Sequence, residues 1–246
     1  MNNPVPHPGP SRSTPAGLAG GEGVKTIVIT GATGVLGNKT AQAFAARGHS
    51  LALLAHNQSK LDSLARDLNL PDERFFSSIV DLRDGQAVQA AAEAVAAKFG
   101  SVHALIHLVG GWVGGKTLPE TSEEDLNFML GQHVWTTFHL FRAFSPKLAA
   151  SGWGRVIIIS PSTVSEPPAK RGVYNAAKAA QENLVLTLAA ELKESSVTAN
   201  IIQVRAIDVD GTRKGTGASP HEIVAAMLYL FSDEAGKITG ARIPLY

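Results

Sequence analysis

Tyr174 and Lys178 are the residues of this chain whose types and spacing are best suited to chemistry. They lie in an alanine-rich stretch that favours a helix, and one helical turn places both side chains on the same face. An ammonium beside a phenol favours the phenolate, so Lys178 is expected to lower a tyrosine pKa that is ordinarily about 10. A tyrosine tuned in this way can exchange a proton with a carbonyl or alcohol oxygen near neutral pH.

A glycine-rich loop near the start of the chain is suited to hold a phosphate. Residues 24–30 form a β-branched run typical of a buried strand, and residues 31–37 follow with the spacing Gly-x-x-Gly-x-x-Gly. Glycines let the backbone approach a pyrophosphate, while the N–H groups and dipole of the next helix attract the anion. An ordinary tight turn between a strand and a helix would look the same.

The elements that must position these residues alternate along the chain. The strands are expected at 24–30, 50–54, 75–80, 104–109, 155–160, 198–204 and near 241–246, and the helices near 34–47, 58–68, 85–99, 121–150 and 172–194. Such alternation predicts a parallel sheet with right-handed crossovers.

Two segments together resemble the motifs of the short-chain dehydrogenases/reductases: Thr-Gly-Ala-Thr-Gly-Val-Leu-Gly at 30–37 and Tyr-Asn-Ala-Ala-Lys at 174–178. The resemblance covers residues 24–246 and implies a Rossmann-type α/β fold, a doubly wound seven-stranded parallel sheet with helices on both faces. It also implies a nicotinamide cofactor and hydride transfer to or from C=O, C–OH or C=N. The residues it places at the cofactor are Gly31, Thr33, Gly34, Val35, Leu36, Gly37, Asp81, Leu82, Val109, Gly110 and Lys178.

Composition narrows the class of protein. The 22 basic and 21 acidic residues leave a net charge of +1 without a basic cluster, so no nucleic-acid partner is expected. The chain has no cysteine, which excludes disulfides and cysteine-bound metal and fits a cytoplasmic protein. No apolar run approaches the ~20 residues of a membrane span. Residues 1–23, rich in proline, glycine and serine, are expected to be a disordered extension rather than a secretory signal, leaving a single domain over 24–246.

The end of the second strand bears on the choice between NAD and NADP. An acid there would hydrogen-bond the ribose 2′-OH, whereas a base would accept a 2′-phosphate. The strand ends in His56 and Asn57, with no carboxylate, and NADP users of the resembled family commonly carry Ala-Arg-Asn at this point. We therefore expect NADP(H) rather than NAD(H). The alternative is that His56 and Lys60 are merely solvated loop residues.

The expected catalytic centre departs from the family pattern. Pro161 stands where the resemblance expects a serine, and the flanking Ser162, or less favourably Ser160, is a candidate to steady a substrate oxygen. The relay asparagine of the family is replaced by Gln132-His133. His133 is thus a candidate for the relay, although it also fits a packed helix histidine.

One branch of the family, the dihydropteridine reductases, shares several of these departures. It resembles this chain in the Gly-Gly-Trp-x-Gly-Gly stretch at 110–115 and in 132–136, and it also lacks the serine. Trp112 is suited to stack on a flat substrate ring, or equally to anchor its own loop. The polar segment 205–222 is expected to close over the site as a lid, with an ordinary surface loop as the alternative.

The expected activity is reduction of a small carbonyl or pterin-like C=N substrate, with Tyr174 as proton donor and Lys178 on the ribose hydroxyls. The rival is a dinucleotide-binding sensor or structural protein with little or no activity, because several catalytic positions are altered. The helix that carries Tyr174 has an apolar stripe, and members of the resembled family usually associate through this helix. The resemblance therefore implies a homodimer or homotetramer. Periodicity by itself predicts only core packing for the stripe residues Ala177, Ala180, Leu184 and Leu188.

Overall fold

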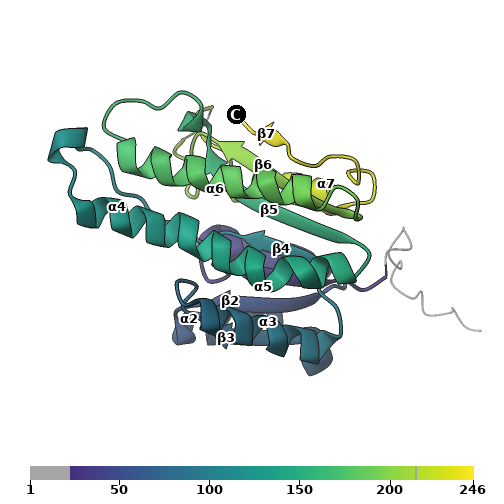
Figure 1. Ribbon diagram of the computed structural model, residues 1–246. Helices are drawn as coiled ribbons and strands as arrows, with labels where there is room; N and C mark the ends of the chain where they lie inside the picture. The colour runs from purple at the N-terminus through teal and green to yellow at the C-terminus, as the bar shows by residue number, and fades with distance from the viewer. Residues whose placement is uncertain (1–22, 214) are drawn as a thin grey trace, which may run out of the picture.

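The structure is a computed structural model that describes residues 23–213 and 215–246 (Figure 1). Apart from Gly23, the expected disordered extension lies outside these residues. The strands are β1 Thr26–Thr30, β2 Ser50–Ala55, β3 Phe75–Ile79, β4 Ala104–His107, β5 Gly154–Pro161, β6 Val197–Val204 and β7 Arg242–Pro244. The α-helices are α1 Val35–Ala46, α2 Gln58–Leu68, α3 Gly85–Phe99, α4 Glu123–Leu130, α5 Thr136–Ala150, α6 Gly172–Glu191 and α7 Pro220–Phe231. The shorter turns are η1 Asp72–Arg74, η2 Leu118–Glu120, η3 Gly131–Trp135 and η4 Ser162–Val164.

Within the described residues, seven strands form one sheet in the order β3-β2-β1-β4-β5-β6-β7, and every neighbouring pair is parallel. The expected Rossmann-type doubly wound sheet is therefore confirmed. The strand order reverses between β1 and β4, so the chain leaves these two strands toward opposite faces. In sheets of this kind the crevice at the carboxyl ends of such a pair is where ligands bind.

Helices cover both faces of the sheet. Apolar side chains of α3, α5 and α6 pack on one face, which is turned to the viewer in Figure 1, and those of α1, α2 and α7 pack on the other. The edge strands β3 and β7 are partly exposed, whereas the five central strands are almost entirely buried, and β1, β2 and β6 have no exposed residue. This explains why their sequences are continuous apolar runs rather than alternating ones.

The expected helix at 121–150 is wrong in one respect, because it is two helices joined by a π-helical turn. Helix α4 ends at Leu130, η3 follows with the wider π pattern, and α5 begins at Thr136. Such turns have one extra residue per hydrogen-bonded ring and occur frequently at functional sites. Here the turn carries His133.

Helix α7 was not expected from periodicity, and the end of the expected lid, residues 220–222, belongs to it. The helix starts with a capping box in which the Ser219 hydroxyl accepts from the backbone N–H of Glu222 and the Glu222 carboxylate accepts from the backbone N–H of Ser219. This Ser-x-x-Glu signal before an apolar run is readable from sequence. Smaller corrections are that the strand at 104–109 ends at His107, the last strand is only Arg242–Pro244, and the helix at 172–194 ends at Glu191.

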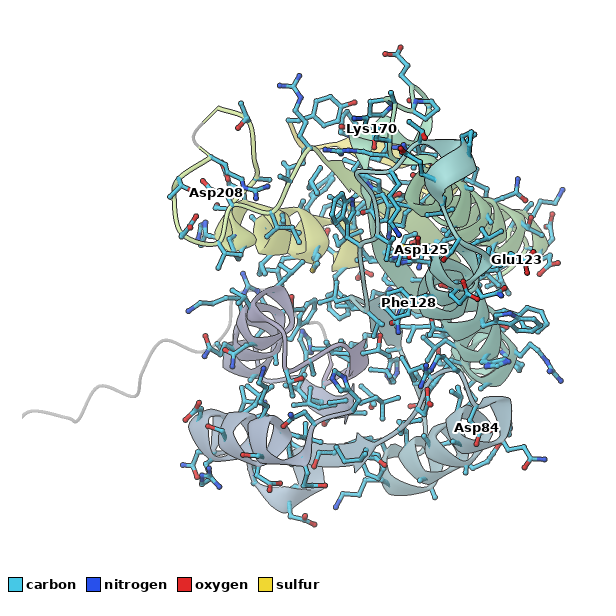
Figure 2. All side chains as sticks on the ribbon, turned by 90° about the vertical axis from the view of Figure 1, so that its left-hand side faces the viewer. Asp84, Glu123, Asp125, Phe128, Lys170 and Asp208 are labelled. Atoms are coloured by element: carbon cyan, nitrogen blue, oxygen red, sulfur yellow. The ribbon has the colours of Figure 1, made fainter. Side chains whose placement is uncertain are left out.

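Figure 2 looks onto the end of the sheet where the loops after the strands gather. Its labels mark these segments: Asp84 follows β3, Asp125 and Phe128 lie on α4 beyond β4, Lys170 follows β5, and Asp208 follows β6. Loops far apart in the sequence therefore lie on the same side of the molecule.

Candidate active site

A cavity of about 200 Å³ lies at this edge, against the ends of β4, β5 and β6. Seven of the predicted site residues line it, and they are spread along the sequence from position 36 to position 178. It is lined by Leu36, His107, Leu108, Val109, Gly110, Gly111, His133, Ile159, Ser160, Pro161, Tyr174, Lys178, Val204, Arg205, Ala206 and Ile207. The predicted residues outside this lining are Gly31, Thr33, Gly34, Val35, Gly37, His56, Asn57, Asp81, Leu82, Trp112 and Ser162.

The glycine loop forms the turn from β1 into α1. Gly31 has φ +68°, and a Cβ there would lie 2.9 Å from the carbonyl carbon of Leu108 in the β4 loop. A Cβ on Gly37 would lie 2.3 Å from the carbonyl oxygen of Gly31. Both positions therefore require glycine for the turn to close and for the β1 and β4 loops to touch. Gly34 is the N-cap of α1, where no side chain caps the helix and the first turn has no acidic residue. The helix start thus remains suited to an anion.

Lys178 is almost fully buried beneath the cavity and makes two short hydrogen bonds. Its Nζ donates to the carbonyl oxygen of Ile159 at 2.7 Å and to Oε1 of Gln181 at 2.6 Å. Burial lowers the pKa of Lys178 from 10.5 to about 7, and the Glu182 carboxylate acts in the opposite direction. The amine therefore changes charge near neutral pH.

Tyr174 lies one helical turn before Lys178 in α6, and both line the cavity, as the spacing predicts. The expected effect on its acidity is wrong. Burial raises the pKa of Tyr174, opposed by the positive charge of Arg171 rather than by Lys178. The two hydrogen bonds of the Lys178 amine go to acceptors on β5 and α6 and not to the phenol. Tyr174 is accordingly a protonated phenol at neutral pH, suited to donate a proton.

His133 is brought to the cavity by the η3 turn. Its Nε2 lies 3.0 Å from the carbonyl oxygen of Gly111, which can only accept, so Nε2 carries the proton. Its Nδ1 is buried without a hydrogen-bond partner among the described residues. Burial, followed by the charge of Lys178, lowers the pKa of His133 to about 4. The imidazole is thus neutral at pH 7, with one acceptor atom available.

The structure places Ser160, rather than Ser162, in the cavity wall. Ser160 is 1% exposed, and its Oγ has no hydrogen-bond partner among the described residues. Ser162 is half-buried in η4 and lies outside the lining. Of the two candidates, Ser160 has the hydroxyl that is buried at the site.

The residues expected at the adenosine end of a cofactor lie away from the cavity. His56 is exposed just after β2, and the Asn57 side chain accepts from the Lys60 backbone N–H at 2.9 Å, which caps α2. The Asp81 carboxylate accepts from the backbone and guanidinium of Arg83, which lowers the pKa of Asp81 to about 2. An aspartate at this position would stabilise the same local turn in a protein that binds no cofactor.

Trp112 lies on the glycine-rich loop after β4 but does not line the cavity. It is 58% exposed, and a Cβ on Gly114 would lie 2.6 Å from its ring atom Cζ2. The indole thus folds over its own loop in this structure. In the 205–222 segment, Arg205, Ala206 and Ile207 line the cavity.

Four polar residues in or beneath the cavity wall were not predicted. His107 ends β4 as a buried imidazole, with Nδ1 2.6 Å from Thr30 Oγ1. Burial, followed by the charges of Lys178 and His133, lowers its pKa to about 3. A histidine that closes an apolar strand was a usable signal for it. No such sequence signal marked the other three. Two of them, Gln181 and Thr137, form a buried hydrogen bond, and the third is Arg205.

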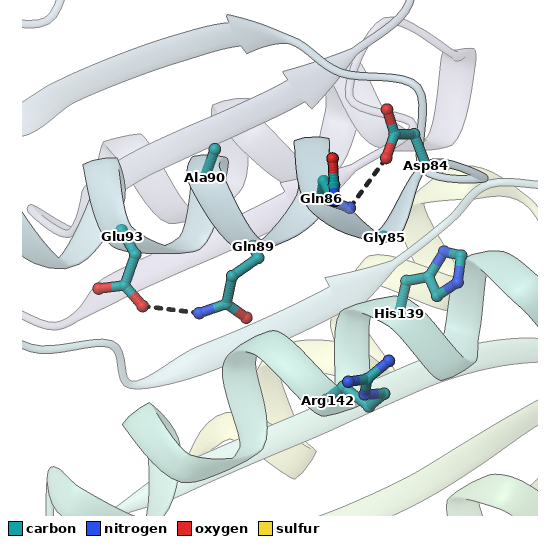
Figure 3. A pocket seen from close by; sticks show the side chains of 8 residues that line it. All are labelled: Asp84, Gly85, Gln86, Gln89, Ala90, Glu93, His139 and Arg142. Atoms are coloured by element: carbon teal, nitrogen blue, oxygen red, sulfur yellow. Dashed lines mark hydrogen bonds between the residues drawn. The ribbon is translucent and has the colours of Figure 1, made fainter.

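A larger hollow of about 700 Å³ lies between α3 and α5 (Figure 3). It is bordered by polar side chains such as Gln89, Glu93 and Arg142, and none of the chemically suited residues above lines it. The smaller cavity is therefore the candidate active site.

The described part of the chain brings no three His, Asp or Glu side chains together in a cluster fit for a metal ion. None of the helices in residues 23–213 and 215–246 combines the length and hydropathy that a membrane span requires.

Known proteins resemble the chain over most of its length. A family model described as short chain dehydrogenase matches residues 25–218. The D-threitol dehydrogenase of Mycolicibacterium smegmatis is 28% identical over 237 residues, covering 89% of this chain and 90% of that protein.

Two solved structures have the same fold. The NADPH-bound short chain oxidoreductase of Pseudomonas aeruginosa PAO1, described as containing an atypical catalytic center, matches with a TM-score of 0.83 at 24% identity, covering 90% of this chain and 95% of that one. An NAD⁺-bound xylitol dehydrogenase matches with a TM-score of 0.79 at 21% identity, covering 90% and 97%.

Proposed function

The chain belongs to the short-chain dehydrogenase family of oxidoreductases, and from this premise we propose that it reduces the carbonyl group of a small organic substrate with NADPH. One observation carries the proposal. Tyr174 and Lys178, one helical turn apart, line a cavity at the carboxyl end of the sheet together with Leu36 of the glycine turn. A proton donor and a cation thus lie beside the place where a dinucleotide is expected to reach.

The chain's own residues fit a dinucleotide. Gly31, Gly34 and Gly37 form a turn that tolerates no side chain at two of its positions, and it leads to the uncapped start of α1, where a pyrophosphate would lie. Val109, Gly110 and Lys178 would hold the nicotinamide ribose half. Asp81 and Leu82 would hold the adenine, with Thr33, Val35 and Leu36 beside the phosphates.

NADPH is favoured over NADH by the end of β2. His56 and Asn57 follow the strand, and no carboxylate there would repel a 2′-phosphate. Solved structures of similar fold contain NADPH in one case and NAD⁺ in another, so the fold is compatible with either. The preference therefore depends on residues 56–60 of this chain.

The chemistry assigned to each residue follows from its protonation state. A nicotinamide, when bound, supplies the hydride that adds to the carbonyl carbon. Tyr174, a partly buried phenol with a raised pKa, donates its proton to the carbonyl oxygen, so that C=O becomes CH–OH. Lys178, which has two of its hydrogens bound to protein oxygens, would donate its remaining hydrogen to the ribose hydroxyls. Ser160 would donate a hydrogen bond to the substrate oxygen, the role first assigned to Ser162, and His133 would accept a proton or water through Nδ1.

A pterin-like C=N substrate is the second candidate. It is favoured by the local resemblance of residues 110–115 to the dihydropteridine reductases, and Trp112 would stack on a flat substrate ring. We further propose a cytoplasmic homo-oligomer that pairs through the outer face of α6, where Ala180 and Leu184 are only half-buried.

The test is a fluorescence titration with NADPH and NADH, followed by cofactor oxidation against ketones, quinones and quinonoid dihydropterin. Tyr174→Phe should bind NADPH normally but lose activity by about 100-fold or more. Tyr229→Phe, an exposed tyrosine on α7, is the matched control. Tight binding without turnover of any substrate would favour a dinucleotide sensor, and failure to bind either nucleotide would refute the proposal.

A further inference from the structure

Gln181 is a polar side chain buried in the core beneath the candidate active site. It lies on α6, three residues after Lys178, and is 1% exposed. A primary amide costs free energy to bury unless both of its ends are hydrogen-bonded. An apolar residue at this position would pack against the neighbouring helix without that cost, so the presence of an amide requires an explanation.

Both ends of the amide are satisfied by a directed chain of hydrogen bonds. Oε1 of Gln181 accepts from Lys178 Nζ at 2.6 Å, and Nε2 donates to Thr137 Oγ1 at 2.7 Å. The Thr137 hydroxyl in turn donates to the carbonyl oxygen of His133 at 2.7 Å. The direction is consistent throughout, because an ammonium can only donate and a carbonyl can only accept.

The bridge ties the amine to the turn that carries the second candidate catalytic group. Lys178 is on α6, Thr137 is on α5, and His133 is on the π-helical turn η3. With the Ile159 carbonyl as the second acceptor, two of the three hydrogens of the ammonium are directed to protein oxygens. One hydrogen, or a lone pair in the neutral amine, is left for the cavity that Lys178 lines.

We propose that Gln181, held in place by Thr137, is a positioning residue that sets where the Lys178 amine lies and whether it carries a proton. The proposal deepens the proposed function, in which Lys178 assists the reaction, and rests on it for its catalytic meaning. The bridge itself belongs to the chain whether or not the protein is a reductase.

Several other charged or titratable groups interact electrostatically with the amine or line the same cavity. Burial disfavours its charge and Glu182 favours it. The Gln181 amide oxygen, 2.6 Å from Nζ, stabilises the charged amine as Glu182 does. Removing this oxygen should therefore lower the pKa of Lys178, whereas substituting a carboxylate for the amide should raise it. The groups to be held constant in any test are Glu182 on α6, Tyr174 on α6, His107 on β4, His133 on η3 and Arg205 beyond β6.

The experiment measures the pKa of Lys178 by NMR in protein made with isotope-labelled lysine, without cofactor or substrate. The resonance is assigned by its loss in Lys178→Arg. Gln181→Leu, which removes the acceptor, should lower the pKa by about one pH unit. Gln181→Glu should raise it by about 1–3 units, because an anion replaces the amide oxygen. Thr137→Val, which removes the acceptor of Gln181 Nε2, should lower it by less than Gln181→Leu does.

Gln42→Glu, an exposed position on α1 across the sheet, is the control and should leave the Lys178 titration unchanged. Thermal unfolding confirms that each variant is folded; if Gln181→Glu is not, the other two variants carry the test. An unchanged pKa of Lys178 in every folded variant would overturn the proposal. Since no turnover is needed, a wild-type protein without reductase activity would refute the proposed function and leave this result standing. In an active enzyme, the pH profile of kcat/KM should shift in the same directions.

Discussion

The imidazole of His133 packs edge-on against the phenol of Tyr174, with ring centroids 5.7 Å apart and ring planes inclined by 76°. The two rings come from different elements, the π-helical turn η3 and helix α6. The Gly111 carbonyl holds the imidazole from its other side at 3.0 Å. The phenol proposed to donate a proton is therefore oriented by a side chain whose own position depends on the loop after β4.

Replacement of His133 distinguishes a role in proton relay from a purely structural role in packing. His133→Phe retains a ring against Tyr174 but removes Nδ1, so kcat should fall about tenfold or more while the Kd for NADPH stays unchanged. Steady-state kinetics and fluorescence titration would check this. His221→Phe, on the exposed start of α7, is the matched control. Wild-type kcat in His133→Phe would mean that His133 is a packed histidine only.

The two serines should behave differently. Ser160→Ala removes a buried hydroxyl that has no partner among the described residues, so the unfolding free energy should stay level or rise by about 1 kcal/mol. Its kcat/KM should nevertheless fall, because the substrate oxygen loses a donor. Ser162→Ala should leave both unchanged. The reverse pattern in parallel assays would restore the role to Ser162, as the sequence favoured.

The glycine turn should not tolerate a methyl group at its last position. In Gly37→Ala the new Cβ would lie 2.3 Å from the Gly31 carbonyl oxygen, so the turn must shift. The unfolding free energy should fall by about 1–3 kcal/mol and NADPH binding should weaken. Denaturant unfolding and titration measure the two effects. Gly23→Ala, where a Cβ meets nothing within 4 Å, is the control; equal behaviour of the two variants would contradict the prediction.

Cofactor preference should respond to a charge at the end of β2. His56→Asp places a carboxylate where a 2′-phosphate is expected, so NADPH should bind about tenfold more weakly or worse, and NADH should not. His56→Asn is the uncharged control, because it removes the imidazole without adding an anion. If His56→Asp leaves the ratio of the two Kd values unchanged, the 2′-phosphate lies elsewhere.

Acid should destabilise the protein through its buried histidines. Burial lowers the pKa of His107 to about 3 and of His133 to about 4, against 6.5 ordinarily. The unfolded chain therefore binds protons that the folded chain does not, and stability falls as the pH drops from about 6.5 to about 4, on the order of 2–3 kcal/mol for each histidine. Differential scanning calorimetry should show a smaller loss of Tm on acidification in His107→Gln than in the exposed control His221→Gln. Equal losses would mean that His107 is charged in the fold at low pH.

Local features of the sequence were sufficient to predict the parallel sheet and the helix that carries Tyr174 and Lys178. Continuous apolar runs predicted the strands of a sheet buried on both faces, because such strands have no solvent side to alternate with. The alanine-rich stretch predicted the helix that carries Tyr174 and Lys178, and their spacing placed both side chains on one face, since helix geometry is local. Helix α7 was missed although its capping box, Ser219 with Glu222, is also a local signal.

Only the tertiary structure decided what the site residues touch. A four-residue spacing placed Lys178 beside Tyr174, but its hydrogen bonds go to Ile159 on β5 and to Gln181, whose second partner is on α5. The Tyr174 pKa is raised rather than lowered because burial of the phenol outweighs the opposing charge of Arg171. Whether Ser160 or Ser162 enters the cavity depended on where β5 ends. Burial and contacts between distant elements arise from packing, and no local pattern contains them.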